Sequence, residues 1–156
     1  MHNQEIHRQW QVLQSLITKS SAASAADIEL QAHWAKYICV LSAGLIENAL
    51  KEIYGKFTRT NTSEPIANFV IDKLSIIRNP KTERFLYISG SFKPSWKVDL
   101  EAFVNIDGRG DAIDSIMNNR HLIAHGKNSN ITLHDIKIYL RKSYEVMEFV
   151  EKQCLT

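Results

Sequence analysis

The longest helical pattern of this chain is residues 27–57, DIELQAHWAKYICVLSAGLIENALKEIYGKF. Its apolar side chains recur at steps of three and four residues, which keeps one face of an α-helix apolar. They are Leu30, Trp34, Tyr37, Ile38, Leu41, Leu45, Ala49, Ile53 and Phe57. The spacing predicts a helix of roughly 30 residues and ~45 Å, which needs partners along its whole length. A glycine inside a helix costs about 1 kcal/mol relative to alanine, so we expect another helix to approach closely at Gly44.

Both ends of the chain also carry helical patterns. The first covers residues 4–18, where apolar side chains alternate with glutamine and histidine at helical spacing. The last begins after Thr132, which forms a capping pair with Asp135, and it continues to about Cys154. No segment shows the alternation typical of a strand. The sequence therefore predicts an all-α bundle built on two long antiparallel helices plus shorter helices.

The middle of the chain predicts one further helix, an irregular segment and a second helix. A helix opened by Pro65 stops at Asn79-Pro80, because the residue before proline disfavours the helical conformation. Residues 78–97 contain glycine, serine and proline breakers, so we expect irregular structure there. A helix over about 111–125 follows, with Asp111 as its cap, and we expect its apolar side chains to face inward.

Length and composition indicate one ordinary globular domain. The chain has 156 residues, of which 44% are apolar and 23% charged. We expect a single domain over residues 1–156, with an N-terminal helix within 1–20 and a core bundle over 27–156. The net charge of +2 is too small to indicate a nucleic-acid partner by itself, so such a claim depends on where the charges lie.

The cysteines and the N-terminal residues predict a cytoplasmic protein. Cys39 and Cys154 lie far apart in apolar helical patterns, which is typical of buried free thiols in a reducing compartment. The first residues are polar, and no apolar stretch approaches the ~20 residues of a membrane span. We therefore expect neither a signal peptide nor a membrane partner.

The stretch Asn118-Asn119-Arg120-His121-Leu122-Ile123-Ala124-His125-Gly126 holds the densest group of arginine and histidine in the chain. On a helix, His121 and His125 share one face, whereas Arg120 and His125 lie ~140° apart around the axis. Gly126 is a candidate left-handed stop, which places His125 in the last turn. A histidine that changes protonation near neutral pH, beside a permanent forked cation, suits acid–base chemistry on a phosphodiester.

The strongest bias of charge lies between residues 73 and 97. The basic residues there are Lys73, Arg78, Lys81, Arg84, Lys93 and Lys97, against one acidic residue, Glu83. We interpret Lys81, Arg84, Lys93 and Lys97, together with Lys127 after the motif, as contacts to an RNA backbone. The same run is also compatible with an ordinary solvated surface.

Simpler roles for the motif residues stay open at this stage. His125 could bond a nearby carbonyl at the helix end, and Arg120 could pair with Glu47 inside the bundle. His121 and His125 have the spacing of a zinc pair, but Leu122 stands where metalloproteases carry glutamate. No third ligand is evident, so we predict no metal site.

Residues 120–126, followed by a loop and a threonine-capped helix, resemble the HEPN superfamily. Its mark is an arginine, four to six intervening residues and a histidine, and the spacing here is four. The Ile-Ala-His-Gly ending, and residues 42–47 of the long helix, are similar to the RiboL-PSP-HEPN branch. The likeness extends over roughly residues 28–149. It implies a helical, cofactor-free and metal-independent ribonuclease, of the kind that acts as a toxin or phage-defence effector.

The resemblance also implies roles and partners. Arg120 and His125 would be the catalytic pair, in a cleft formed by two copies of the chain. The supporting residues would be His121, Asn119, Glu47 and Tyr139. His121 departs from the family, many members of which have another polar residue, often asparagine, after the arginine. The expected partners are RNA, a second copy and an antitoxin or nucleotidyltransferase. The alternative function is a non-catalytic helical module of a defence complex that mediates interaction or binds a nucleotide or RNA.

Overall fold

A computed structural model describes residues 1–156 as seven helices without a strand. The helices are α1 (Gln4–Ala23), α2 (Ile28–Asn61), α3 (Glu64–Ser75), α4 (Thr82–Phe92), α5 (Pro94–Val104), α6 (Arg109–Ala124) and α7 (Leu133–Leu155). The predicted all-helical bundle is confirmed. None of the helices combines the length and the apolar character that crossing a membrane requires.

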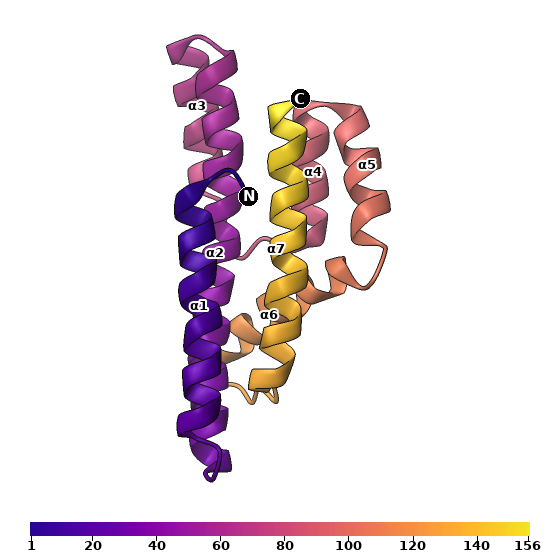
Figure 1. Ribbon diagram of the computed structural model, residues 1–156. Coiled ribbons are helices and arrows are strands. Elements are labelled where there is room, and N and C mark those ends of the chain that lie inside the picture. The colour runs from indigo at the N-terminus through magenta and orange to yellow at the C-terminus, as the bar shows by residue number, and fades with distance from the viewer.

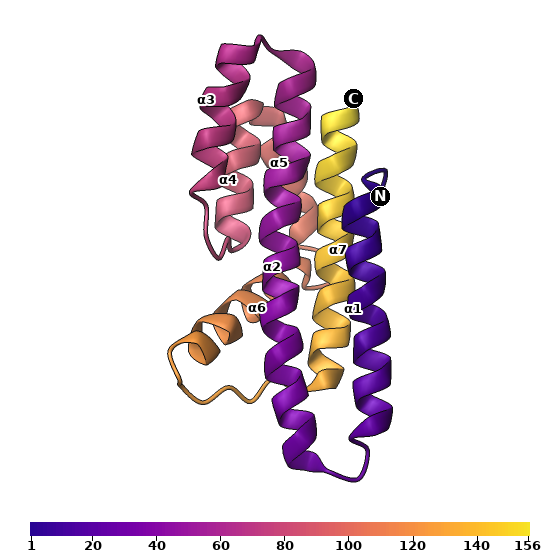
Figure 2. The ribbon, with the colours of Figure 1, turned by 90° about the vertical axis from the view of Figure 1, so that its left-hand side faces the viewer.

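The long helices α2 and α7 lie side by side and run in the same direction (Figures 1 and 2). The expected antiparallel arrangement of these two helices is therefore wrong. Instead α1 is antiparallel to both, because a short connection turns the chain from α1 into α2. The backbone N–H of Asn3, before α1, donates to Glu151 near the end of α7 at 2.6 Å. The hydrophobic core lies between α1, α2, α6 and α7 and extends to buried residues of α3, α4 and α5.

The apolar face of α6 points inward as expected. Ile113, Ile116 and Met117 are fully buried against α2 and α7. The helix begins at Arg109 after Gly108, whose φ of 63° is left-handed, so the expected cap at Asp111 is wrong. Glycine adopts this conformation without a steric penalty, which lets the chain turn directly into the helix.

The predicted capping pair of α7 is confirmed. Thr132 accepts a hydrogen bond from the backbone of Asp135, and Asp135 accepts one from the backbone of Thr132. Each side chain thus satisfies a backbone donor that the first turn of the helix leaves free. This cap ends the loop after α6 and begins α7.

The middle of the chain is helical, so the expected irregular segment over residues 78–97 is wrong beyond residue 81. Helices α4 and α5 bury Phe85, Ile88, Trp96 and Leu100 against the rest of the core. This burial outweighs the weak helical propensity of the serine and glycine residues in α4. Pro94 lies at the first position of α5, where proline is favoured.

Two helical glycines, Gly44 on α2 and Gly90 on α4, differ in their surroundings. Gly44 on α2 is exposed, and a Cβ there would meet no atom within 4 Å, so the expected close helix approach is wrong. The close approach occurs instead at Gly90 on α4, where a Cβ would lie 3.1 Å from the Lys97 side chain. A glycine at position 90 therefore allows α4 and α5 to pack closely.

The two cysteines are free thiols. Cys39 is fully buried on α2, and its burial raises the pKa of the thiol to about 12. Cys154 is only half-buried near the end of α7. Burial, with the negative charge of Glu151 nearby, raises its pKa to about 12 as well. Both side chains contribute to the hydrophobic core.

Candidate active site

The arginine–histidine motif, residues 118–126, lies at the C-terminal end of α6. Figure 2 shows this helix projecting to the side of α2, with the following loop returning to α7. The helix stops where the sequence predicted, because Gly126 has a left-handed φ of 64°. The backbone N–H groups of Gly126 and Lys127 donate to the carbonyls of Ile123 and Leu122 at 3.1 and 2.9 Å. These bonds satisfy carbonyls that the helix end would otherwise leave free.

The two motif histidines lie next to each other on the surface. The ring centroids of His121 and His125 are 4.4 Å apart, with an angle of 54° between the ring planes. Both residues are exposed, and neither imidazole makes a hydrogen bond within the chain. The simpler role in which the His125 side chain bonds a carbonyl is therefore absent from this structure. Both rings are accessible to a ligand from solvent.

Arg120 is half-buried, and its guanidinium forms neither an ion pair nor a hydrogen bond. A guanidinium carries five N–H donors, and a carboxylate or phosphate is its usual partner. The alternative pairing with Glu47 does not occur. The Glu47 carboxylate binds Lys51 at 2.8 Å instead. Arg120 thus keeps all its donors available for an anion outside the chain.

Glu47 on α2 holds the connection between α3 and α4. Its carboxylate accepts a hydrogen bond from the backbone N–H of Asn79 at 2.7 Å and lies 3.7 Å from the Arg78 guanidinium. Burial alone would raise the pKa of Glu47, but the hydrogen bonds from Lys51 and Asn79 and the nearby positive charges lower it on balance. The carboxylate therefore stays ionised while it holds this segment.

Asn119 connects the motif helix to the loop that follows it. Its side-chain amide donates to the carbonyl of Ser115 at 2.8 Å, and its carbonyl oxygen accepts from the Ser129 hydroxyl at 2.7 Å. This arrangement orients the loop that carries Lys127, which is exposed. Tyr139 on α7 is half-buried and packs against the core. Neither Lys127 nor Tyr139 makes a side-chain hydrogen bond.

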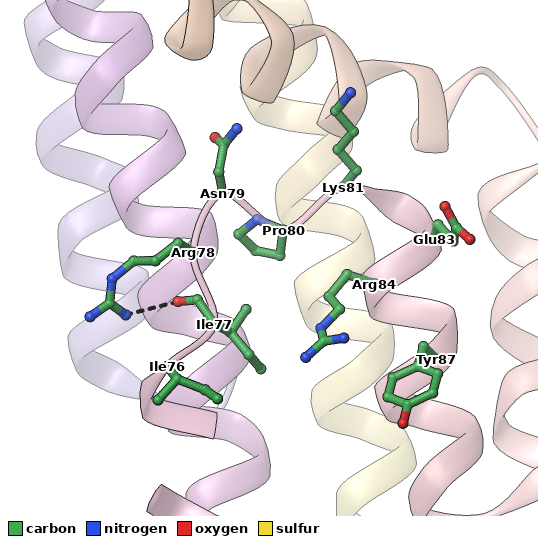
Figure 3. A pocket seen from close by; sticks show the side chains of 9 residues that line it. All are labelled: Ile76, Ile77, Arg78, Asn79, Pro80, Lys81, Glu83, Arg84 and Tyr87. Atoms are coloured by element: carbon green, nitrogen blue, oxygen red, sulfur yellow. Dashed lines mark hydrogen bonds between the residues drawn. The ribbon is translucent and has the colours of Figure 1, made fainter. Parts of the chain in front are cut away.

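The basic residues predicted to contact RNA fall into separate places. Lys81 and Arg84 line an open cavity of about 630 Å³ at the start of α4 (Figure 3). Lys93 and Lys97 lie near the other end of α4, an 11-residue helix of roughly 16 Å, where Lys93 follows the helix and Lys97 on α5 packs against Gly90. The ammonium of Lys93 lies 6.0 Å from the ring centroid of Trp96. Basic residues that follow one another in the sequence thus lie at opposite ends of α4 in the structure.

The structure also brings together residues that the sequence alone did not indicate as parts of a site. The side chain of Asn79 donates to the carbonyl of Met117, one turn before Arg120, at 3.3 Å. The sequence indicates only a helix stop at Asn79-Pro80, although asparagine is among the residues that tolerate a left-handed φ, here 49°. Ser129 and Tyr87 carried no distinctive pattern. Their positions depend on contacts between helices.

No three histidine, cysteine, aspartate or glutamate side chains gather closely enough to hold a metal ion. Comparison with protein families shows that residues 5–156, nearly the whole chain, match the model of RiboL-PSP-HEPN. Neither the curated proteins nor the solved structures contain a match to this chain.

Proposed function

This chain belongs to the RiboL-PSP-HEPN family, and we propose that it is a metal-independent endoribonuclease, acting as a toxin or phage-defence effector. Membership of this family suggests a function related to RNA. The observation that supports cleavage is that the arginine and histidine side chains of the motif are free to bind a ligand. Arg120 has no partner within the chain, and two exposed histidines lie on the same end of α6. These are the groups that hold a phosphate and move protons.

The proposed reaction uses the 2′-hydroxyl of RNA as the nucleophile. His125 of one copy takes the hydroxyl proton, and the oxygen attacks the adjacent phosphorus as the bond to the 5′-oxygen breaks. A second, protonated histidine gives its proton to the leaving oxygen. The products are a 2′,3′-cyclic phosphate and a 5′-hydroxyl. Arg120 stabilises the charge that gathers on the phosphate oxygens in the transition state.

The proposed active form is a homodimer. A helix places Arg120 and His125 ~140° apart around its axis, so one copy does not direct both groups at the same phosphate. Two copies related by a twofold axis would supply one base and one acid from identical residues. His121, next to His125, would orient or assist the proton transfer. An antitoxin or nucleotidyltransferase would be the regulatory partner.

The test is cleavage of RNA in the presence of EDTA by the unchanged chain and by His125→Ala. Loss of a general base lowers such rates by about 10²–10⁴-fold, so the variant is expected to show almost no cleavage. His134→Ala is the matched control, because His134 is another exposed histidine at the start of α7. Analysis of the product ends should find cyclic phosphate. Cleavage abolished by EDTA, or retained in full by His125→Ala, would rule out this mechanism.

A further inference from the structure

A surface groove between α3 and α4 is not used by the proposed chemistry. It consists of the cavity in Figure 3 and an adjoining one of about 270 Å³, which share Ile77, Arg84 and Tyr87. We name the two together the α3–α4 groove. Its walls are α3, the connection after it and α4. Neither Arg120 nor His125 lines it.

The α3–α4 groove has a strong positive bias. Four basic side chains line it, and Glu83 is its only carboxylate. They are Lys73, Arg78, Lys81 and Arg84. Two of these cations have carboxylate neighbours, since Arg78 lies 3.7 Å from Glu47 and Lys73 lies 3.7 Å from Asp72. Lys81 and Arg84 form no ion pair, so both can bind an external anion.

The groove also exposes aromatic rings. Tyr87 is 62% exposed and Phe69 is 63% exposed, although both rings lie against a largely apolar wall. A cation lies over each of them. The Arg84 guanidinium carbon is 5.1 Å from the Tyr87 centroid, and the Lys73 ammonium is 5.2 Å from the Phe69 centroid.

We propose that the α3–α4 groove binds single-stranded RNA, with a base stacked on Tyr87, the adjacent phosphate held by Arg84 and a further phosphate of the strand held by Lys81. Aromatic rings interleaved with unpaired cations are the arrangement that binds unpaired bases and their backbone together. Duplex RNA keeps its base faces stacked inside the helix, so it cannot use the rings. The inference extends the proposed ribonuclease function, because it gives the substrate a second holding site.

The groove is attached to the motif helix. The backbone N–H of Thr82, at the start of α4, donates to the carboxylate of Asp114 on α6 at 2.7 Å. The hydroxyl of Thr82 donates to the carbonyl of Gly110, also on α6, at 2.8 Å. Asn79 in turn bonds the carbonyl of Met117, one helical turn before Arg120. These bonds fix the cation-bearing end of the groove relative to α6. Asn79, which lines the groove, is thus bonded to the turn of α6 that precedes Arg120.

The test measures binding separately from cleavage. The His125→Ala chain is titrated against a fluorescent single-stranded oligouridylate of about 12 nucleotides, and binding is followed by fluorescence anisotropy. Tyr87→Ala added to this chain is expected to weaken binding about fivefold to a hundredfold. Tyr37→Ala is the matched control, because Tyr37 is 54% exposed on α2, outside the groove. It should bind as the parent does.

A second variant tests the phosphate contact. Arg84→Ala should reduce the slope of log affinity against log salt concentration by about 0.7, the value for one phosphate contact to a single strand. Arg141→Ala, which removes an exposed arginine on α7, should leave the slope unchanged. An unlabelled duplex should compete much less well than the single strand.

Three results would overturn the inference. They are equal binding by Tyr87→Ala and Tyr37→Ala, equal competition by duplex and single strand, and no binding of RNA by a folded His125→Ala chain. Circular dichroism confirms folding of each variant. Cleavage by the unchanged chain with binding insensitive to Tyr87 would reject the groove and leave the ribonuclease proposal intact. Binding that depends on Tyr87, in a chain that does not cleave RNA, would support the groove and reject the ribonuclease proposal.

Discussion

The Glu47 carboxylate on α2 accepts a hydrogen bond at 2.7 Å from the backbone N–H of Asn79, 32 residues later in the chain. Asn79 has a left-handed φ of 49°, which is uncommon for a residue other than glycine. Its side chain also donates to the carbonyl of Met117 on α6. Glu47 and Asn79 together therefore join the connection between α3 and α4 to both α2 and α6.

Replacing Glu47 by glutamine should destabilise the fold in a pH-dependent way. The pKa of this carboxyl is lowered in the folded chain, so its stabilisation is fully present above the ordinary pKa of 4.5. It is lost as the pH falls through the folded pKa. We expect Glu47→Gln to lower the free energy of unfolding by about 1–2 kcal/mol at neutral pH, because a charge-assisted hydrogen bond is weakened. Urea denaturation at a series of pH values measures this difference.

Glu52→Gln is the matched control, since Glu52 is exposed on the same helix and has no hydrogen-bonding or ionic partner. It should change the stability little at any pH. A Glu47→Gln deficit that stays constant down to the acid limit would show that the carboxylate charge does not stabilise this connection.

Two glycine substitutions should change stability in opposite directions. Gly126→Ala forces a side chain into a left-handed conformation and should cost about 1–2 kcal/mol, although no atom crowds the position. Gly44→Ala lies in an exposed part of α2 with open space around it, so it should stabilise the chain by about 0.5–1 kcal/mol. Thermal denaturation of both variants compares the two effects. Destabilisation by Gly44→Ala would mean that another surface covers this position.

Two arginine substitutions should separate activity from stability. Arg120 has no partner, so Arg120→Ala should leave the unfolding free energy within about 0.5 kcal/mol of the original. Its cleavage rate should fall by about 10²–10³-fold, because a donor to the transition state is removed. Arg109 on the same helix bonds Glu145 at 2.8 Å, and its guanidinium lies 4.3 Å from the Phe103 ring centroid.

Arg109→Ala should therefore lower the stability by about 1–2 kcal/mol, through the loss of both contacts. Its cleavage rate should stay close to that of the unchanged chain at a temperature where it is folded. Chemical denaturation and a cleavage assay on the same samples make the comparison. A marked loss of stability in Arg120→Ala would indicate a structural role for this residue.

The helices that were predicted well are those with a strong periodic pattern or a clear terminal signal. The Thr132 and Asp135 pair predicted the start of α7, and Gly126 predicted the end of α6, because both signals act within one helical turn. The prediction failed over α4 and α5. Serine, glycine and proline there have weak local preference for a helix, and burial of Phe85 and Trp96 by other helices decides their state.

In the candidate site too, features that depend on neighbouring residues were predicted, and features that depend on distant residues were not. The spacing of Arg120 and His125, and the stop of their helix at Gly126, followed from the local sequence, whereas the exposure of this helix end did not. The partner of Glu47 did not, because that carboxylate contacts a residue 32 positions away. The separation of Lys81 and Arg84 from Lys93 and Lys97 also required knowledge of helix α4.

Amino-acid order alone determined the helical class, the terminal signals and the arginine–histidine motif, since each depends on hydrogen bonds and side-chain spacing within a few residues. Helix direction, the contact between Glu47 and Asn79, and the open groove that α3 and α4 form beside Arg84 and Tyr87 were settled by packing. Those features depend on which apolar faces are buried together, and that choice is made among segments distant in the chain.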